Sequence, residues 1–353
     1  GVPYRAKLGY VWAGPPVPPR FFTAAAVAAQ FGDRQLDLRA DLAPLIAREL
    51  GWAHYTELFR AHPGRTAMAW EEFAERYAAS PDASALVAVA VPSPADRFDL
   101  AALDRPLAGR HFPDVGALQG WLRAHVRADL ARAADPAFST DAAVFSSLLL
   151  CHGTVATLVG AGRLTARSEA EDLGGWWMNL FSYLASGPPS PRLEELLALS
   201  EAGIVRFLGA DVRLELDDDA RVFRARSASH DEVVEARALV EARLPVPDVT
   251  GTPDPLVTRL LLRGSGAEKV LTDPSSGVHG TGRLHVDADH RVVDAAGHAQ
   301  PHLFAAGYWT SGGQVAAFAR PRTNAPFFRQ NDALARTLWR ELTAAPAHVG
   351  EVA

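Results

Sequence analysis

Cysteine is almost absent from this sequence. The single cysteine, Cys151, lies in the apolar stretch SSLLLCHGTV. One cysteine excludes an internal disulfide framework and a cysteine-ligated zinc site. A lone cysteine among apolar neighbours in a helical stretch predicts a small buried side chain, although His152 follows it.

Lysine is also scarce, and arginine carries nearly all of the positive charge. The chain has only Lys7 and Lys269, and its formal net charge is −6. This balance argues against nucleic acid or an anionic membrane surface as a partner. With 48% hydrophobic and 22% charged residues, the 353 residues are enough for a packed core and for two domains. We expect a small-molecule substrate.

Long apolar runs and an amino-terminal leader are missing as well. No stretch approaches the roughly 18–20 consecutive apolar residues of a membrane span, and GVPYRAKLGYVW lacks the apolar centre of a signal peptide. We therefore expect no membrane partner and a cytoplasmic location. The chain opens on Gly1 without a methionine and runs into the proline-rich GPPVPPRFF, so we expect a fragment.

Complete motifs for dinucleotide binding, nucleophilic catalysis and metal binding are not found. RGSGAEK has Lys269 where a G-x-G-x-x-G fingerprint needs its third glycine, and VGAGRL follows a helix, so both are predicted to be turns. There is no G-x-S-x-G motif. Five histidines between 279 and 302 alternate with aspartates, which suits a solvated hairpin, and no matching cysteine supports zinc. We expect no metal site.

Helical patterns dominate residues 23–202. TAAAVAAQFG offers Thr23 as a helix N-cap and Gly32 as its stop, and Pro44 marks the start of a longer helix. SALVAVAVP is either a buried strand or a helix end. The almost wholly apolar helix predicted over 141–159 must be surrounded by other helices.

The pattern changes to short strands after Gly203. A strand-rich region over 203–300 has a turn at Asp217–Asp219 and is interrupted by a helix with Pro255 in its first turn. In the segment 301–345, PHLFAAG is predicted as the last strand and is followed by a helix; 346–353 is a tail. The class predicted for this chain is α+β, as part of a larger α/β fold.

One predicted helix, SEAEDLGGWWMNLFSYLASGPP, is crowded with aromatic residues. Ser168 is predicted to cap it, with an acid three residues on. Trp176 cannot face the same way as both Phe181 and Tyr183. The cluster forms either helix–helix core contacts or an aromatic wall for a planar ligand.

The run LFAAGYWTSGGQVAAFARPRTNAPFF carries the densest chemistry. A strand that ends at a glycine, followed by small residues, brings backbone N–H groups close to a ligand. A helix start preceded by Arg, Thr and Asn suits polar or anionic groups, although Thr323 or Asn324 could simply cap that helix. No catalytic acid, base or nucleophile is identified. The candidate cofactor-binding residues are Gly307, Tyr308, Thr310, Ser311, Gly312, Arg320, Arg322, Thr323 and Asn324.

Several long stretches resemble the carboxy-terminal part of a bacterial family of FAD/NAD(P)-binding flavoproteins. They are GVPYRAKLGY, WWMNLFSYLASGPPSPRLEELLALSEAGIVRFLG, ALVEARLPVPD, and LFAAGYWTSGG with FARPRTNAPFFRQNDALAR. The resemblance implies a Rossmann-like fold with helical insertions. Residues 1–22 then come from a missing amino-terminal nucleotide-binding part with its G-x-G-x-x-G, and the chain returns to the FAD domain over 203–300 and 301–345. Related flavoenzymes usually place an acid after the glycine of the returning strand, where this chain has Tyr308.

The resemblance implies FAD and NAD(P)H as cofactors and a flavin-dependent oxidoreductase whose substrate is unassigned. A narrower alternative is an N-hydroxylating flavin monooxygenase, whose NADPH oxidation depends on an amine substrate. An alternative from another class is a helical ligand- or partner-binding module with a degenerate flavin site. Tyr308 in place of an acid favours that module, whereas the arginines near Asn324 count against it.

Overall fold

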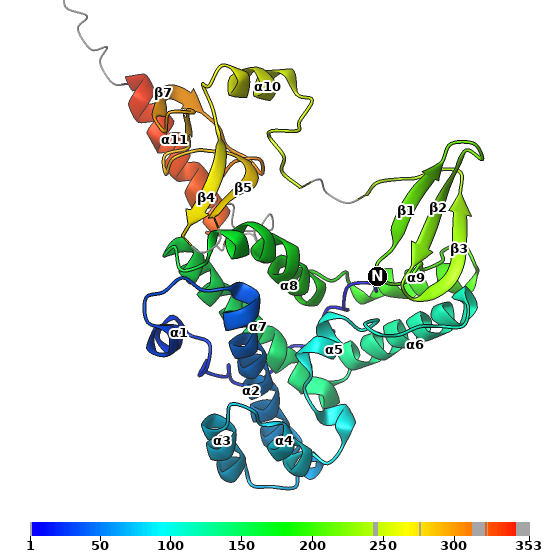
Figure 1. Ribbon diagram of the computed structural model, residues 1–353. Coiled ribbons are helices and arrows are strands. Elements are labelled where there is room, and N and C mark those ends of the chain that lie inside the picture. The colour runs from blue at the N-terminus through cyan, green and yellow to red at the C-terminus, as the bar shows by residue number, and fades with distance from the viewer. Residues whose placement is uncertain (1, 243–245, 275–276, 313–321, 323, 344–353) are drawn as a thin grey trace, which may run out of the picture. The chain divides into compact units, whose positions relative to one another are not determined.

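The chain divides into two compact units, which we call the helical unit (Gly1–Glu241) and the C-terminal unit (Ala242–Ala353). The computed structural model describes residues 2–242, 246–274, 277–312, 322 and 324–343 (Figure 1). Helices and small antiparallel sheets confirm the α+β class. The boundary falls inside the strand-rich region predicted over 203–300, so the first sheet belongs with the helices.

Local chemistry marks the ends of some of the α-helices described in the helical unit. The Thr23 side chain accepts the Ala26 N–H, and Gly32 ends the first helix at φ 62°, as the sequence predicts. Pro44 stands in the first turn of the second helix, also as predicted. The helices are α1 (Ala24–Phe31), α2 (Ala43–Ala61), α3 (Trp70–Ala79), α4 (Ser84–Ala90), α5 (Leu100–Asp104), α6 (Val115–Ala134), α7 (Ser139–Gly160), α8 (Met178–Ala185) and α9 (Ser190–Glu201).

The main core of the helical unit lies where α2 packs along α7. Ile46 and Leu50 of α2 join Leu148 and Cys151 of α7 in one buried cluster. By length and composition the segment Pro136–Gly160 could cross a membrane, with a mean hydropathy of 1.8. Its buried residues against α2 are typical of a core helix, as the sequence predicts for an apolar helix surrounded by others.

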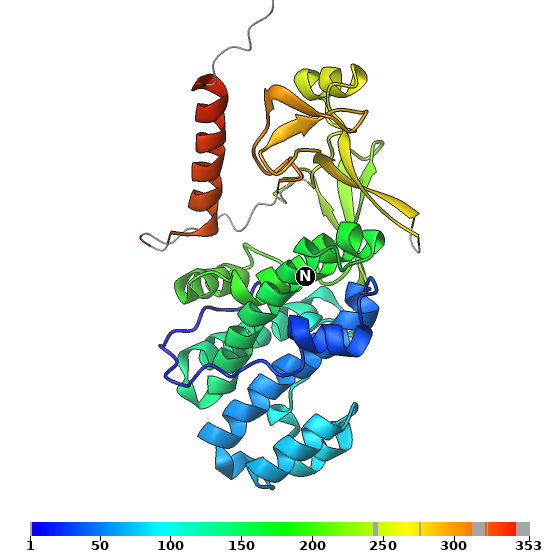
Figure 2. The same cartoon turned by 90° about the vertical axis from the view of Figure 1, so that its left-hand side faces the viewer.

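A second core joins the far end of α2 to α3 and α4, which Figures 1 and 2 show beside it. Phe73 stacks on Phe59 with ring centroids 4.7 Å apart and on Tyr77 with centroids 5.4 Å apart. SALVAVAVP, ambiguous in sequence, forms helix α4, because Leu86 and Ala90, four residues apart, both reach this core.

Two π-helices, Leu38–Leu42 and Ser168–Trp177, contact each other in the helical unit. The predicted cap at Ser168 is wrong. The Thr165 hydroxyl accepts the Ser168 N–H, and the Ser168 hydroxyl accepts the Leu38 N–H at 2.7 Å instead. Ser168 is therefore used to join the two π-helices. The described 3₁₀ turns are Pro63–Arg65, Pro94–Asp96 and Pro136–Phe138.

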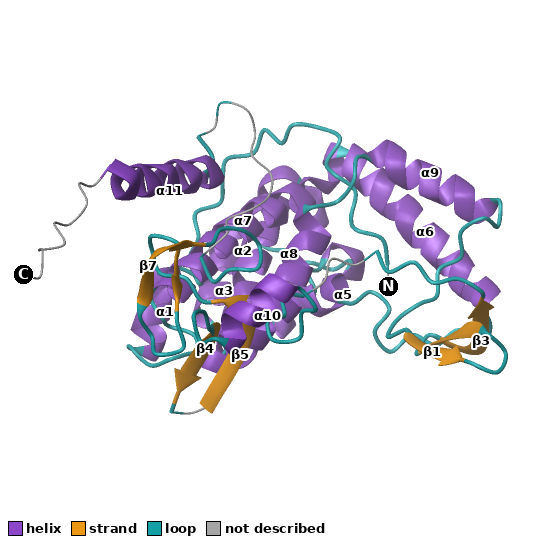
Figure 3. Ribbon diagram, turned by 90° about the horizontal axis from the view of Figure 1, so that it is seen from above, coloured by secondary structure: helices purple, strands orange, loops and turns teal. Residues whose placement is uncertain are grey.

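A three-stranded antiparallel sheet completes the helical unit. It comprises β1 (Arg213–Asp217), β2 (Val222–Ser227) and β3 (His230–Ala236), with the predicted turn after Asp217. The Glu232 carboxylate accepts the Val115 N–H at 2.9 Å, which ties β3 to the start of α6. Figure 3 shows α6 and α9 side by side near this sheet.

In the described part of the C-terminal unit there are two antiparallel strand pairs and two helices. Pro255 begins the first helix, as predicted. The predicted last strand ends at Phe304 rather than Gly307 and pairs antiparallel with its neighbour. The described named strands pair only in antiparallel fashion, so the Rossmann-like arrangement remains an expectation. The elements are α10 (Pro255–Leu262), β4 (Glu268–Asp273), β5 (Gly277–Leu284), β6 (Arg291–Val293), β7 (Ala299–Phe304) and α11 (Pro326–Thr343).

Candidate cofactor site

The turn after β7 is held together by its own polar groups. The Gly307 carbonyl accepts the Thr310 N–H at 3.1 Å and the Thr310 hydroxyl at 2.9 Å. Gly307 has φ 134°, a value that L side chains rarely adopt. Thr310 is only 4% exposed. Its hydroxyl and its N–H, one of the backbone groups expected to face a cofactor, therefore both close the turn.

The same turn is anchored on β5. Leu284 donates its N–H to the Trp309 carbonyl at 2.8 Å and accepts the Ser311 N–H at 2.9 Å, which makes a short parallel bridge. The Ser311 hydroxyl accepts the Val286 N–H at 3.0 Å. The backbone at Trp309 and Ser311 is thus fixed to the end of β5, and the Ser311 hydroxyl is also used within the protein.

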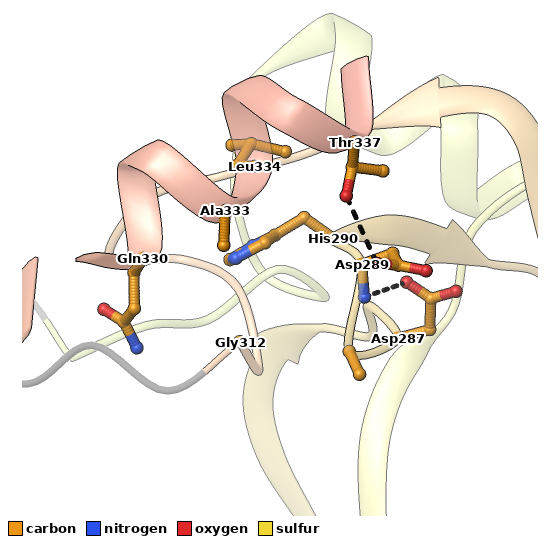
Figure 4. Close-up of a pocket in the computed structure, with 9 residues that line it drawn as sticks. Asp287, Asp289, His290, Gly312, Gln330, Ala333, Leu334 and Thr337 are labelled. Atoms are coloured by element: carbon orange, nitrogen blue, oxygen red, sulfur yellow. Dashed lines mark hydrogen bonds between the residues drawn. The ribbon is translucent and has the colours of Figure 1, made fainter. Parts of the chain in front are cut away.

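Gly312 leads into a cavity of about 200 Å³ between the turn before β6 and helix α11. Figure 4 shows the His290 ring extending beneath α11 toward Ala333. A Cβ atom at position 312 would lie 3.1 Å from the His290 ring, so glycine fits closely there. The cavity is lined by Asp287, Ala288, Asp289, His290, Gly312, Gln330, Ala333, Leu334 and Thr337.

His290 is the most unusual residue of this cavity. Its φ is 66°, in the left-handed region that favours glycine. Its Nδ1 atom is buried and has no hydrogen-bond partner within the described part of the chain. Buried polar atoms normally have a partner, so an unpaired one beside a cavity marks a place for a ligand group.

The carboxylates around His290 are occupied by the protein itself. Asp287 accepts the N–H groups of Asp289 and Arg291, at 2.9 and 2.8 Å. Asp289 accepts the Thr337 hydroxyl at 3.3 Å, and the Arg291 guanidinium lies 2.7 Å from Glu341 of α11. These contacts hold α11 against the turn. In the ranges that the structure describes, no group of three or more His, Cys, Asp or Glu side chains could hold a metal ion.

The cavity is smaller than most ligand-binding sites. Sites for drug-sized ligands usually enclose about 300–1,000 Å³, so a 200 Å³ cavity has room for one group of a larger molecule. The free Nδ1 of His290 and the bare backbone at Gly312 are the features of this chain that such a group could contact.

The other predicted site residues that the structure describes are not among the residues that line this cavity. Arg320 and Thr323 lie outside the described residues. Arg322 and Asn324 have φ values of 63° and 45° and are exposed. The first turn of α11 is bonded to the Ala325 carbonyl, which accepts the Phe328 N–H at 2.9 Å. Asn324 is therefore not the residue whose carbonyl opens the helix.

Tyr308 lies at the surface, next to a cation. It is 47% exposed, and the Arg283 guanidinium lies 5.6 Å from the centroid of its ring. Sequence reasoning named Tyr308 but not Arg283, because only the bridge between β5 and the turn brings them together.

The aromatic cluster of α8 and its preceding π-helix divides between core and surface. Trp177 is fully buried and donates its indole N–H to Nδ1 of His152 at 3.2 Å. Burial lowers the pKa of His152. Trp176 is only partly buried, and the Arg39 guanidinium lies 4.4 Å from its ring centroid. The core interpretation holds for Trp177, whereas one face of Trp176 is covered by a cation.

The sequence did not predict two sets of cavity residues, those on one face of α11 and His290. Gln330, Leu334 and Thr337 recur at the spacing of one helix face, which periodicity could have revealed. His290 was assigned to a solvated hairpin. Nothing in sequence predicts its positive φ, because that conformation is imposed by the surrounding hydrogen bonds.

Comparisons with known proteins show which enzymes this chain is similar to. No family model matches the chain. It is 34% identical over 314 residues to an L-aspartate N-monooxygenase (nitrosuccinate-forming) of Streptomyces cremeus, covering 86% of this chain and 46% of that protein. It is 31% identical over 351 residues to the same-named enzyme of Streptomyces davaonensis, covering 95% of this chain and 53% of that protein.

A fungal relative extends the similarity. The nitrosuccinic acid synthase npaA of Aspergillus oryzae is 27% identical over 302 residues, which cover 83% of this chain and 45% of that protein. The chain thus spans about half the length of the curated relatives it matches. Over most of its own length it is similar to proteins that are named for forming nitrosuccinate.

Proposed function

We propose that this chain is part of a flavin-dependent N-monooxygenase that oxidises the amino group of an amino acid, with L-aspartate as the substrate. The observation that carries the proposal is the similarity to two L-aspartate N-monooxygenases over 86% and 95% of the chain. Of the hypotheses drawn from the sequence, this similarity supports the N-hydroxylating enzyme more than an oxidoreductase of unspecified substrate. The cytoplasm is the proposed location.

FAD and NAD(P)H are the proposed cofactors. When bound, a flavin reduced by NAD(P)H supplies the activation of oxygen. The backbone around Gly307 to Gly312 is held on β5, and since the N–H groups of Thr310 and Ser311 are bonded to Gly307 and Leu284, we propose Gly312 as its contact with a cofactor. The free Nδ1 of His290 offers a hydrogen bond at the cavity beside Gly312. We propose these groups as contacts, with the remainder of the cofactor bound by residues outside the described set.

The test uses the full-length natural protein that contains this chain. Purified protein should carry or take up FAD, and its NADPH oxidation should rise when L-aspartate is added, with an N-oxygenated product identified by mass spectrometry. Succinate is the matched control, because it keeps both carboxylates and lacks the amine.

Three results would contradict the proposal in different ways. NADPH oxidation that is equal with aspartate and succinate would leave only a general oxidoreductase. Oxidation of other amino acids but not aspartate would overturn the substrate. Protein that cannot be reconstituted with FAD would favour the third hypothesis, a helical binding module with a degenerate flavin site.

A further inference from the structure

Arg283 and the exposed Tyr308 form a pair on the C-terminal unit, of which the cofactor prediction included only Tyr308. The Arg283 guanidinium lies 5.6 Å from the centroid of the Tyr308 ring. Among the described residues, its side chain forms no ion pair with a carboxylate. Its neighbour in the turn, Trp309, is 41% exposed. A partly buried cation of β5 therefore lies beside an exposed ring of the turn after β7, and a second exposed ring follows in that turn.

Charged groups of both signs lie near this pair, among them Lys269, Glu268 and Asp287. Lys269 lies on β4, which pairs with β5, and it makes no ion pair within the described ranges. Burial, and then the charge of Lys269, lower the pKa of His285, two residues from Arg283. The nearby carboxylate of Glu268 accepts the Gly282 N–H at 2.7 Å. Among the described residues, this carboxylate is bonded to the backbone and forms no ion pair with the Arg283 guanidinium.

The pair is held in place by the backbone on both sides. Leu284, the residue after Arg283, exchanges hydrogen bonds with Trp309 and Ser311 on either side of Thr310. Gly282, the residue before Arg283, has φ 69°, and its carbonyl accepts the Val249 N–H at 2.9 Å. A guanidinium held near an aromatic ring of a fixed turn loses less freedom when it binds an anion.

We infer that Arg283 and Tyr308 form a contact for a phosphate group of a dinucleotide cofactor. Arginine matches phosphate geometry with two parallel N–H groups, and the Tyr308 ring attracts the guanidinium at 5.6 Å. An acid at position 308 would attract Arg283 and neutralise it, whereas Tyr308 leaves its positive charge for the ligand. The inference rests on the proposed function, because that function implies the dinucleotides FAD and NADPH.

The experiment measures binding to the full-length protein and needs no substrate. The variants are Arg283→Gln, Arg283→Lys and Tyr308→Leu. Arg263→Gln is the matched control, because Arg263 is an exposed arginine of the same unit, at the end of α10. Dissociation constants for FAD, riboflavin and NADPH are measured by fluorescence quenching and calorimetry, at low and at high salt.

Loss of a charged hydrogen bond predicts that Arg283→Gln weakens one dinucleotide by roughly tenfold to a hundredfold. Riboflavin, which has no phosphate, should bind as before. Arg283→Lys keeps the charge and should retain part of the affinity, and Tyr308→Leu should lose a smaller part. The wild-type affinity should fall with salt more steeply than that of Arg283→Gln.

The ligand that weakens identifies the source of the phosphate. A loss confined to FAD assigns the contact to the flavin cofactor, and a loss confined to NADPH assigns it to the nicotinamide cofactor. The inference is overturned if Arg283→Gln and Arg263→Gln have equal effects, or if riboflavin weakens as much as FAD. If Arg283→Gln unfolds, the folded Arg283→Lys and Tyr308→Leu proteins decide by the same comparison, and unchanged affinity in both overturns the inference.

The test of the Arg283 contact and the test of the proposed function can fail independently. Dinucleotide binding that depends on Arg283, in a protein that leaves aspartate unoxidised, overturns the substrate alone. Aspartate oxidation with affinities that do not depend on Arg283 overturns the contact alone. Wild-type protein that binds neither dinucleotide overturns both.

Discussion

The helical unit and the C-terminal unit bury apolar side chains to very different extents. The helical unit encloses large rings completely, among them Trp177, Phe22 and Phe73. The core described in the C-terminal unit is built around four residues, Val249, Leu284, Val286 and Val292. Two large apolar residues of α11, Trp339 and Leu342, are 69% and 83% exposed.

Different interactions therefore stabilise each of the two units. Burial of apolar area stabilises the helical unit, and that contribution hardly changes with salt. In the C-terminal unit, polar contacts such as Thr337 with Asp289 and Arg291 with Glu341 attach α11 to the turn before β6. Such contacts contribute less each and are screened by salt. The candidate cofactor site lies in the unit with the smaller core.

The sharpest test of this comparison is a tryptophan truncation in each unit. Trp177→Ala removes a fully buried ring and leaves His152 without its donor, so it should lower the free energy of unfolding by roughly 3–5 kcal/mol. Trp339→Ala removes a ring that is 69% exposed and should change it by less than about 0.5 kcal/mol. Urea unfolding followed by circular dichroism measures both. Equal losses would contradict the comparison.

A second test concerns ion pairs. Asp141, whose side chain is 15% exposed, accepts bonds from Arg132 at 2.7 and 2.9 Å and from Arg5 at 3.2 Å. Asp141→Asn should cost about 3 kcal/mol, because two arginines lose their shared carboxylate. The control is Asp332→Asn in α11, which breaks an exposed pair with Arg336 and should cost under about 1 kcal/mol.

Lowering the pH should also destabilise the helical unit, because it protonates Asp141. Burial alone would raise the pKa of Asp141, but hydrogen bonds from Arg132 and the charges of Arg5 and Arg132 outweigh it and hold the pKa below its usual value. A lowered pKa stabilises the fold above the unfolded pKa, near 4, and this stability is lost as pH falls through the folded value. Unfolding free energies measured at decreasing pH should fall less steeply in Asp141→Asn. An unchanged slope would exclude this role.

A third, smaller loss of unfolding free energy is expected from a glycine substitution in the C-terminal unit. Gly282 has φ 69°, and a Cβ atom there would lie 1.9 Å from the Pro247 carbonyl oxygen. Gly282→Ala should therefore cost roughly 2–3 kcal/mol in that unit. Gly297→Ala is its control, with φ 85° and open space around its Cβ, and should cost about 1 kcal/mol. Hydrogen exchange should place the loss in residues after 242, and a loss of protection in α2 would contradict the division.

The smallest expected effect is a change in the rate at which a disulfide reagent labels Cys151. Burial raises the pKa of the Cys151 thiol to about 12. Its thiolate is then rare at mildly alkaline pH, and disulfide reagents should label it only when the helical unit opens. Trp177→Ala should speed labelling, whereas Gly282→Ala should leave the rate unchanged. Fast labelling of the native protein would contradict the burial of Cys151.

Local signals predicted much of the fold, because caps and turns depend on neighbouring residues. Thr23, Gly32, Pro44 and Pro255 mark element ends where the sequence places them. The cap assigned to Ser168 failed, because a hydroxyl has several possible partners and the Leu38 N–H, 130 residues away, occupies it. Helix α4 was ambiguous since a short apolar run fits a strand or a helix equally.

The candidate site was predicted only in part. The turn of Gly307 to Gly312 was located by its glycines, but the hydroxyls of Thr310 and Ser311 serve the turn itself. Hydrogen-bond partners that are distant in sequence cannot be assigned from spacing. His290 and Arg283 join the site for the same reason, through contacts with Gly312 and Tyr308.

The sequence by itself determined the α+β class, the helix boundaries at caps and prolines, the isolation of Cys151 and the position of the glycine turn. These follow from short-range sterics and hydrogen bonding. Only the tertiary structure decided that Trp177 is core while Trp176 faces a cation, that Ser168 joins two π-helices, and that Arg283 lies beside Tyr308. Each of these depends on which distant segments pack together, and packing is set by the whole chain.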